Sequence, residues 1–139
     1  MLDPKDKKII AALRENSRQS IRELAQSSKL RPSTVHQRLL KLEKEKIIER
    51  YTVKVNNESV GEGFIVFMWI STNQDLPPSF FHDPCIKEVF GITGEYDLLL
   101  KLKFPSIAEF NEYLIRLRKN KVITKTFTQI VTINLKEEL

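Results

Sequence analysis

Polar and cationic side chains recur between residues 32 and 44 at the spacing of one helix face. Ser33, Gln37 and Lys41 are four residues apart, and Thr34 and His36 flank them. Hydroxyl, amide and imidazole groups can hydrogen-bond to base edges in the DNA major groove, and glutamine can pair with adenine through two bonds. We therefore predict base contacts by Ser33, Thr34, His36 and Gln37. The alternative is an ordinary solvated helix face.

Basic residues lie in and beside the same segment. Lysine and arginine contacts to phosphate position a protein on DNA without reading sequence. Arg38 lies at the margin of the apolar face, so pairing with Glu23 or Glu43 inside the fold is an equal alternative for it. The predicted phosphate contacts are Arg31, Arg38, Lys41, Lys46, Arg50 and Lys54.

Two short helices position these groups. Val35, Leu39 and Leu42 repeat at i, i+4 and i+7 and predict the buried back of the polar helix, with Pro32 suited to its first position. Ile21, Leu24 and Ala25 predict a preceding helix that ends near Ser28–Leu30. Together these patterns predict a helix-turn-helix, whose second helix suits insertion into the major groove.

A further helix and a strand complete the predicted N-terminal unit. The helix runs from about Pro4 to Asn16, with Asp3 as its cap. The alternation from Ile47 to Val55 predicts a strand that forms a small wing beside the polar helix. The predicted core of the unit is Ile9, Leu13, Ile21, Leu24, Leu30, Val35, Leu39, Leu42 and Ile47.

Charge is divided unequally along the 139 residues. The net charge is +5, but residues 1–55 hold 14 lysines and arginines against 7 acidic residues, and residues 56–139 hold 9 against 11. The basic surplus therefore coincides with the helix-turn-helix and favours a polyanionic partner, double-stranded DNA.

The second half of the chain has the residue pattern of a β-sheet. Strands are expected at Phe64–Thr72, Ile86–Ile92, Leu98–Phe104 and Thr124–Leu135. Ser106 and Glu109 predict a capping box that opens a helix, with Ile107, Phe110, Leu114 and Leu117 buried. Three prolines between the first two strands leave room for only one helical turn. The order β, short turn, β, β, α, β predicts an α+β, ferredoxin-like βαββαβ domain with a shortened first helix.

The first predicted strand is apolar on both faces, because Ile65, Phe67 and Trp69 alternate with equally apolar neighbours. A sheet covered by helices on one side normally turns a polar face to water on the other. We therefore predict sheet-against-sheet packing in a homodimer, which suits a palindromic DNA site. The alternative is that the N-terminal unit covers this face.

Several classes of protein are disfavoured. Cys85 is the only cysteine, so no internal disulfide forms, and with His82 it makes at most a weak metal pair; we expect no metal and no cofactor. The longest apolar run, residues 64–70, is too short to cross a bilayer. No secretory leader opens the chain, so we expect a cytoplasmic protein.

Two sets of residues, taken in order and spacing, carry a family resemblance. The C-terminal set is the Thr93–Asp97 loop, of G-x-Y-D type, with the strand that follows. The N-terminal set is Leu2-Asp3, Asp6, Ile9, Leu13, Asn16-Ser17-Arg18, Ile21, Leu24-Ala25, Leu30, Val35, Arg38, Leu42-Glu43, Ile47-Ile48 and Tyr51-Thr52. Through them the chain resembles the Lrp/AsnC (leucine-responsive, feast/famine) transcription regulators.

That resemblance implies a winged helix-turn-helix at residues 1–55, a linker at 56–63 and a ligand-responsive dimerisation domain at 64–139. It implies a recognition helix at Pro32–Lys44, homodimers that can assemble into octamers, and an amino-acid effector. The implied effector residues are Gly94, Tyr96 and Asp97. A purely structural role in a tight turn is the alternative for Gly94 and Asp97.

Three departures from the family pattern stand out. Arg31 replaces the usual cap residue before the helix proline, and Lys46 replaces the usual glycine after the helix. Both exchanges add a cation, and a non-glycine residue in the left-handed conformation costs about 1 kcal/mol. The segment from Ile70 to Gly94 is shortened, which puts octamer formation and amino-acid binding in question.

The sequence thus predicts a sequence-specific, DNA-binding transcription regulator that is not an enzyme. One alternative is an architectural DNA-binding protein of low sequence specificity. The other is an enzyme similar to the sirohaem decarboxylases, which would need basic or histidine residues to grip a tetrapyrrole. The net acidic C-terminal half, with one histidine, disfavours the enzyme.

Overall fold

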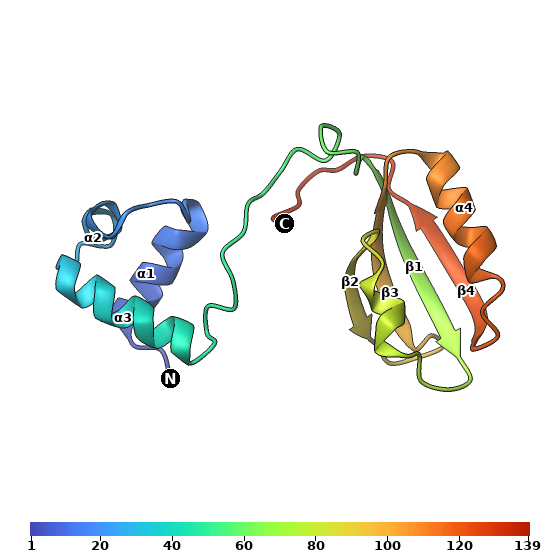
Figure 1. The fold of residues 1–139 in the computed structure, drawn as a ribbon, viewed down its shortest axis with the longest axis horizontal. Coiled ribbons are helices and arrows are strands. Elements are labelled where there is room, and N and C mark those ends of the chain that lie inside the picture. The colour runs from blue at the N-terminus through green and yellow to red at the C-terminus, as the bar shows by residue number, and fades with distance from the viewer. The chain divides into compact units, whose positions relative to one another are not determined.

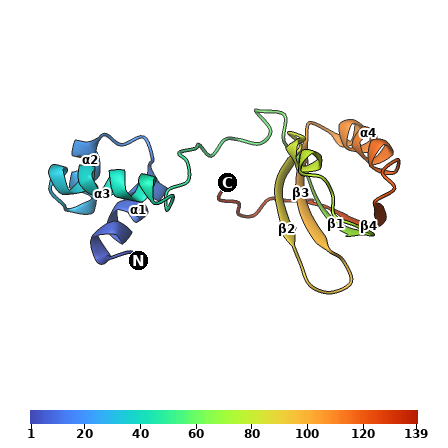
Figure 2. The same ribbon diagram turned by 60° about the horizontal axis from the view of Figure 1, so that its bottom comes forward.

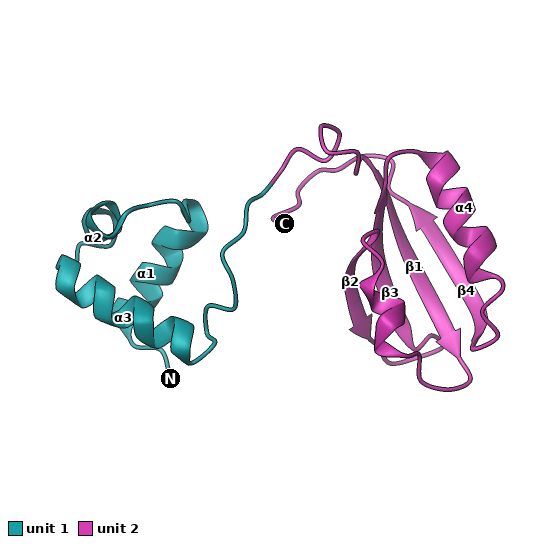
Figure 3. Cartoon of the chain, viewed as in Figure 1, with its two compact units in different colours: residues 1–54 teal, residues 55–139 magenta.

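The computed structural model describes residues 1–139, and these form two compact units, Met1–Lys54 and Val55–Leu139 (Figure 3). Each unit has its own hydrophobic core, so each is described by itself.

The first unit consists of three helices, α1 (Pro4–Glu15), α2 (Ile21–Ser28) and α3 (Pro32–Lys44) (Figure 1). All three were predicted, and α3 has the predicted bounds. The Asp3 side chain accepts a hydrogen bond from the Asp6 N–H at 2.9 Å, and Asp6 returns one by accepting from the Asp3 N–H at 3.2 Å. This reciprocal cap fixes the start of α1.

The core of the first unit gathers the apolar faces of the three helices. Its fully enclosed residues are Ile9, Leu24, Ala25, Val35 and Leu42, with the other predicted residues, except Ile47, packed around them. Ile47 was predicted to be buried, but its side chain is 38% exposed, and Ile48 packs against the core instead. The chain leaves α3 through Lys46 at φ 59°, and this left-handed residue redirects the backbone before Ile47.

The predicted strand Ile47–Val55 is wrong. The segment has no strand structure, and it has no partner, because unit 1 contains only helices. An extended segment without a partner cannot form a ladder of hydrogen bonds. Side chains hold it instead: the Tyr51 hydroxyl donates to the Glu43 carboxylate at 2.8 Å, and the Ser17 hydroxyl donates to the Thr52 carbonyl at 3.3 Å. Unit 1 therefore has no β wing.

The second unit is a four-stranded antiparallel sheet with the strand order β2-β3-β1-β4. This arrangement confirms the predicted ferredoxin-like fold, with its first helix reduced to one short 3-10 turn. The elements are β1 (Phe64–Thr72), η1 (Pro78–His82), β2 (Ile86–Gly91), β3 (Leu98–Phe104), α4 (Ile107–Leu117) and β4 (Ile123–Ile130).

The last strand is shorter than predicted. It was expected to reach Leu135, but β4 ends at Ile130. The Val131 N–H still donates to the Ile65 carbonyl at 2.9 Å. Because β1 begins at Phe64, the residues after Val131 have almost no strand left to pair with. They continue as an irregular C-terminal segment.

The core of the second unit lies between one face of the sheet and α4, which Figure 2 shows on one side of the sheet. Ser106 caps α4 by accepting from the Ala108 N–H at 3.2 Å, and its hydroxyl donates to Glu109, so the predicted pair is present as a side-chain contact. Ile107 was predicted to be buried but is 61% exposed. It is the first residue of the helix, and Phe110, Tyr113 and Leu117 form the buried stripe.

Candidate nucleic-acid interface and effector loop

Helix α3 presents a polar outer face because its opposite side is held in the core. Val35 and Leu42 have no exposed surface and so define the inner side of the helix. At 100° per residue, Ser33, Gln37 and Lys44 then share an outward stripe of roughly 40°. Among the predicted base contacts, Ser33, His36 and Gln37 are exposed and Thr34 is half-buried. The stripe brings hydrogen-bonding groups and a cation to one line on the surface.

Lys44 is a member of this stripe that the sequence prediction missed. It is exposed and follows Gln37 by seven residues, or two helical turns. The predicted cations Arg31, Lys41, Lys46, Arg50 and Lys54 are exposed as well. Spacing alone was enough to find Lys44, since it continues the row that Ser33 and Gln37 begin.

Both ends of α3 have the features predicted for them. Arg31 occupies the cap position, but its side chain accepts no hydrogen bond from the first turn of α3. The backbone N–H groups of that turn therefore have no partner in the cap residue. Free N–H groups at a helix start can receive a phosphate. Lys46 has a left-handed backbone conformation, as predicted from the missing glycine.

Arg38 pairs inside the fold, but with neither of the predicted partners. Its guanidinium contacts Asp3 and lies 3.1 Å from the Asp6 carboxylate, whose side chain is completely buried. The hydrogen bond from the Asp6 N–H and that from Arg38 hold the pKa of Asp3 at about 2, and the two carboxylates raise the pKa of Arg38. Arg38 thereby holds α3 against the start of α1.

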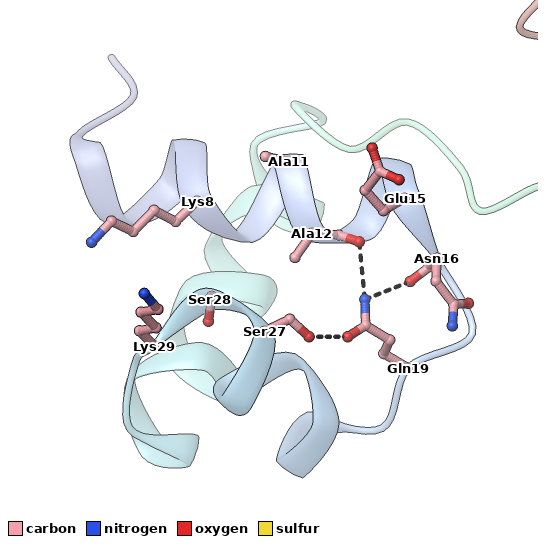
Figure 4. A pocket seen from close by; sticks show the side chains of 9 residues that line it. All are labelled: Lys8, Ala11, Ala12, Glu15, Asn16, Gln19, Ser27, Ser28 and Lys29. Carbon is pink, nitrogen blue, oxygen red and sulfur yellow. Dashed lines mark hydrogen bonds between the residues drawn. The ribbon is translucent and has the colours of Figure 1, made fainter.

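A shallow cavity of about 600 Å³ lies between α1 and α2 (Figure 4). Its polar groups bond to one another. The Gln19 amide donates to the carbonyls of Ala12 at 2.9 Å and Asn16 at 2.8 Å, and the Ser27 hydroxyl donates to Gln19. None of the predicted site residues lines it. The hydrogen bonds in the cavity thus connect α2 to the end of α1 through Gln19, which is a structural role.

The predicted effector loop is a tight connection between β2 and β3. Gly94 has φ +104°, a conformation that side chains rarely adopt. The Asp97 carboxylate accepts a hydrogen bond from the Thr72 N–H at 2.8 Å, and its own N–H donates to the Ile70 carbonyl at 2.9 Å. Asp97 therefore ties the loop to β1, which is a structural role, although the donor lies in the neighbouring strand and not in the turn.

Tyr96 lies beside a charged pair. Its ring is 6.3 Å from that of Phe127, and the Lys125 ammonium lies 4.6 Å from the ring centroid. Lys125 also pairs with Glu95, and this contact raises the pKa of Lys125. The exposed loop and the neighbouring strand β4 therefore bring together a carboxylate, that of Glu95, and a cation, that of Lys125. These charges are of the kinds that could pair with the two charged ends of an amino acid.

The connection that contains His82 and Cys85 shows no metal-binding cluster. The structure has no group of three or more histidine, cysteine or acidic side chains that could hold an ion. Burial, with a smaller contribution from Asp83, raises the pKa of the Cys85 thiol to about 12. None of the helices is long and apolar enough to span a bilayer.

Known proteins resemble the chain over both units. Residues 2–49 match the family model for winged helix-turn-helix DNA-binding domains, and residues 66–139 match the model for the Lrp/AsnC ligand-binding domain. An HTH-type transcriptional regulator of Pyrococcus abyssi is 31% identical, in an alignment that covers 99% of this chain and 97% of the relative.

Solved structures show the same likeness. A transcriptional regulator from Neisseria meningitidis, in complex with L-Met, superimposes with a TM-score of 0.90 at 28% identity, over 99% of this chain and 94% of that one. The Escherichia coli protein AsnC gives 0.86 at 26% identity, over 99% and 96%. With both units matched in sequence and in fold, the chain belongs to the Lrp/AsnC family of DNA-binding transcriptional regulators.

Proposed function

We propose that the chain works as a homodimer that reads a two-fold symmetric DNA site through the outward stripe of α3. The observation that carries this proposal is the stripe itself: hydrogen-bonding groups and cations line one exposed face, in the unit that holds the basic surplus of the sequence. Ser33, Thr34, His36 and Gln37 contact base edges. Arg31, Lys41, Lys44, Lys46, Arg50 and Lys54 contact phosphates, and Arg38 holds α3 in place.

The dimer forms through the face of the sheet opposite α4, which we call the open face. The register places Ile65, Phe67 and Trp69 of β1 on it, and neighbouring strands add Phe90 and Phe127. These two phenylalanines are 55% and 48% exposed. The C-terminal segment covers the end of this face near Ile65, which is buried, and the end with Phe90 and Phe127 stays exposed. Exposed apolar side chains there favour burial against a second copy, and a two-fold pair then presents two α3 helices to two half-sites.

Footprinting on the DNA upstream of the gene, followed by titration of the protected site, tests the DNA-binding mode. Gln37→Ala should cost about 1–3 kcal/mol at one base pair in each half-site, if its contact with adenine is bidentate. Lys41→Ala should weaken binding to all sequences alike and lower the salt dependence. Uniform weakening by both variants, with no protected site, would contradict specific reading and favour an architectural DNA-binding protein.

We further infer that an amino acid regulates this protein at the Gly94–Asp97 loop. The exposed residues of the loop and the Glu95–Lys125 pair support this, as does the L-Met complex of the Neisseria relative. Gly94, Tyr96 and Asp97 shape the site. Calorimetry and sedimentation with each of the twenty amino acids, L-Met first, test it. If no amino acid binds or changes DNA affinity or assembly state, the effector proposal fails.

The same proposal assigns the chain no catalytic activity and places it in the cytoplasm, beside its DNA. Membership in a family of transcriptional regulators supports both inferences. Incubation with sirohaem tests the enzymatic alternative, because decarboxylation would change the mass of the tetrapyrrole.

A further inference from the structure

Leu40 is an apolar residue in the middle of the polar face of α3. Its side chain is 55% exposed, and it is the one large apolar side chain of the three helices that is exposed. The other large apolar residues of α3, Val35, Leu39 and Leu42, all contribute to the core. Leu40 therefore lies outside the core of unit 1.

The position of Leu40 along the helix places it inside the outward stripe. At 100° per residue, Ser33, Gln37, Leu40 and Lys44 lie within an arc of about 60°. Leu40 follows Gln37 by three residues, or about 4.5 Å along the helix axis. Base pairs are spaced by about 3.4 Å, so a helix laid along the major groove can place these two side chains over neighbouring base pairs.

One feature of the major groove suits an apolar side chain at this position. The 5-methyl group of thymine is the apolar group that a base pair presents there, and apolar contact with it distinguishes thymine from the other bases. The residues around Leu40 on the stripe are polar or cationic, which matches DNA better than an apolar protein surface.

We propose that Leu40 packs against the methyl group of a thymine next to the base pair read by Gln37, and thereby selects thymine at that position in each half-site. The inference rests on the DNA-binding mode proposed above. It adds a determinant of specificity that works by apolar contact and not by hydrogen bonding.

Replacement of thymine by deoxyuridine isolates this contact, because the exchange removes the methyl group and keeps base pairing. The preferred half-site is first selected from random DNA with the full-length protein. Each thymine is then replaced singly, and affinities are measured for the wild type, Leu40→Ala and Ile47→Ala. Ile47 is a matched control, since it is also exposed and apolar but lies beyond α3.

At one position in the half-site, deoxyuridine should weaken the wild type and Ile47→Ala by roughly 4-fold, which corresponds to burial of one methyl group. Leu40→Ala should bind the thymine and deoxyuridine sites equally. Since Leu40 is exposed, the variant should keep the wild-type melting temperature. Equal sensitivity of Leu40→Ala and wild type would overturn the proposal, as would a wild type indifferent to every replacement.

The outcomes also separate this inference from the proposed function. Tight binding to a selected site without any methyl effect overturns the role of Leu40 alone. Failure to prefer any sequence over random DNA overturns specific reading by α3, and the role of Leu40 with it. Loss of dimerisation in Leu40→Ala at an unchanged deoxyuridine effect would assign the residue to a protein interface and overturn the thymine contact.

Discussion

The two units use a similar ionic arrangement, but the cations are buried in only one of them. In unit 1 the carboxylate of Asp6 is buried, and the cations around it, Arg38 and Lys41, are 25% and 46% exposed. In unit 2 all three charged side chains are buried, since Lys101 and Lys103 are 9% and 6% exposed, and Glu137, which pairs with both, is 9% exposed. Each site places one acid between two basic side chains.

The difference lies in which partner is free to move. Asp6 belongs to the first turn of α1 and cannot leave the core without unfolding the helix. Glu137 belongs to the irregular C-terminal segment, which has no helix or strand. We therefore expect this segment to detach more readily than α1 unfolds, so that water reaches the two lysines. A buried charge that loses its partner is costly only where water cannot replace the partner. The first site therefore fixes the orientation of α3, and the second fastens the C-terminal segment to the open face.

The largest expected effect is that of Asp6→Ala. The substitution leaves Arg38 with only the more exposed Asp3 and also removes one half of the cap of α1. Breaking a buried ion pair on one side should cost about 3 kcal/mol of unfolding free energy. Chemical denaturation followed by circular dichroism measures it. Trp69, the single tryptophan, lies in unit 2, so its fluorescence should keep its wild-type transition.

Glu15→Ala is the control, because Glu15 is an exposed acid on the same helix. It should change the unfolding free energy little. A loss as small for Asp6→Ala as for Glu15→Ala would show that the buried carboxylate does not hold the helices together.

Glu137→Gln should have the second largest effect, about 2 kcal/mol, as expected for the loss of hydrogen bonds to charged groups. Burial alone would raise the pKa of Glu137, but hydrogen bonds from Asn57, Lys101 and Lys103 outweigh it and lower the pKa from 4.5 to about 2. Because the folded-state pKa is depressed, this stabilisation is present above pH 4.5 and is lost as the pH falls through 2.

Denaturation of the wild type and Glu137→Gln between pH 2 and 7, monitored by Trp69 fluorescence, tests this. The difference between them should be constant above pH 4.5 and shrink at lower pH. Glu138→Gln, an exposed neighbour, should match the wild type throughout. If Glu137→Gln cost more than Asp6→Ala, the comparison between a movable and a fixed partner would be wrong.

These two networks also mark the limit of what the sequence can predict. The bounds of β1 and β3 follow from local periodicity and turn residues, and both were predicted to the residue. The start of α3 follows from Pro32, and its end at Lys44 was predicted from the family resemblance. The wing strand failed because a strand depends on a partner, and periodicity within Ile47–Val55 carries no information about one. The pairing of Arg38 with Asp6 spans 32 residues, a contact that no local pattern encodes.

The candidate site also has features that local patterns predict and features that depend on contacts between distant residues. Exposure of Ser33, His36 and Gln37 follows from helical spacing, and so does the stripe that adds Lys44. The contact of Asp97 with Thr72 depends on the pairing of β1 with β3, so the loop motif alone misplaced its donor.

Tyr113→Phe sharpens a second difference between the units, and its effect should be smaller and of opposite sign. The hydroxyl of Tyr113, in unit 2, is buried without a hydrogen-bond partner. Unit 1 has no buried side-chain nitrogen or oxygen that lacks a hydrogen-bond partner. Burial also raises the pKa of Tyr113, so the phenol stays neutral. Removal of an unpaired buried hydroxyl should stabilise unit 2 by about 1 kcal/mol.

Thermal denaturation monitored at Trp69 measures this gain. Tyr96→Phe is the control, because Tyr96 is only half-buried. Destabilisation by Tyr113→Phe would show that the hydroxyl has a partner in solution, and unit 2 would then satisfy its buried polar groups as completely as unit 1 does.

The smallest expected effect on stability is that of Lys46→Gly, which tests whether unit 1 accepts backbone strain in exchange for a cation. Lys46 has φ 59°, where glycine is free of the side-chain penalty. Relief of strain should stabilise unit 1 by about 1 kcal/mol, and the greater flexibility that glycine gives the unfolded chain reduces this gain.

Removal of the cation should at the same time weaken binding to all DNA sequences alike and reduce the salt dependence by about one phosphate contact. Lys29→Gly is the matched control, because Lys29 has φ 57° but follows α2 and not α3. It should give the same stabilisation and leave a larger share of the DNA affinity. Equal loss of affinity in both variants would assign the effect to total charge, and no loss in Lys46→Gly would remove Lys46 from the interface.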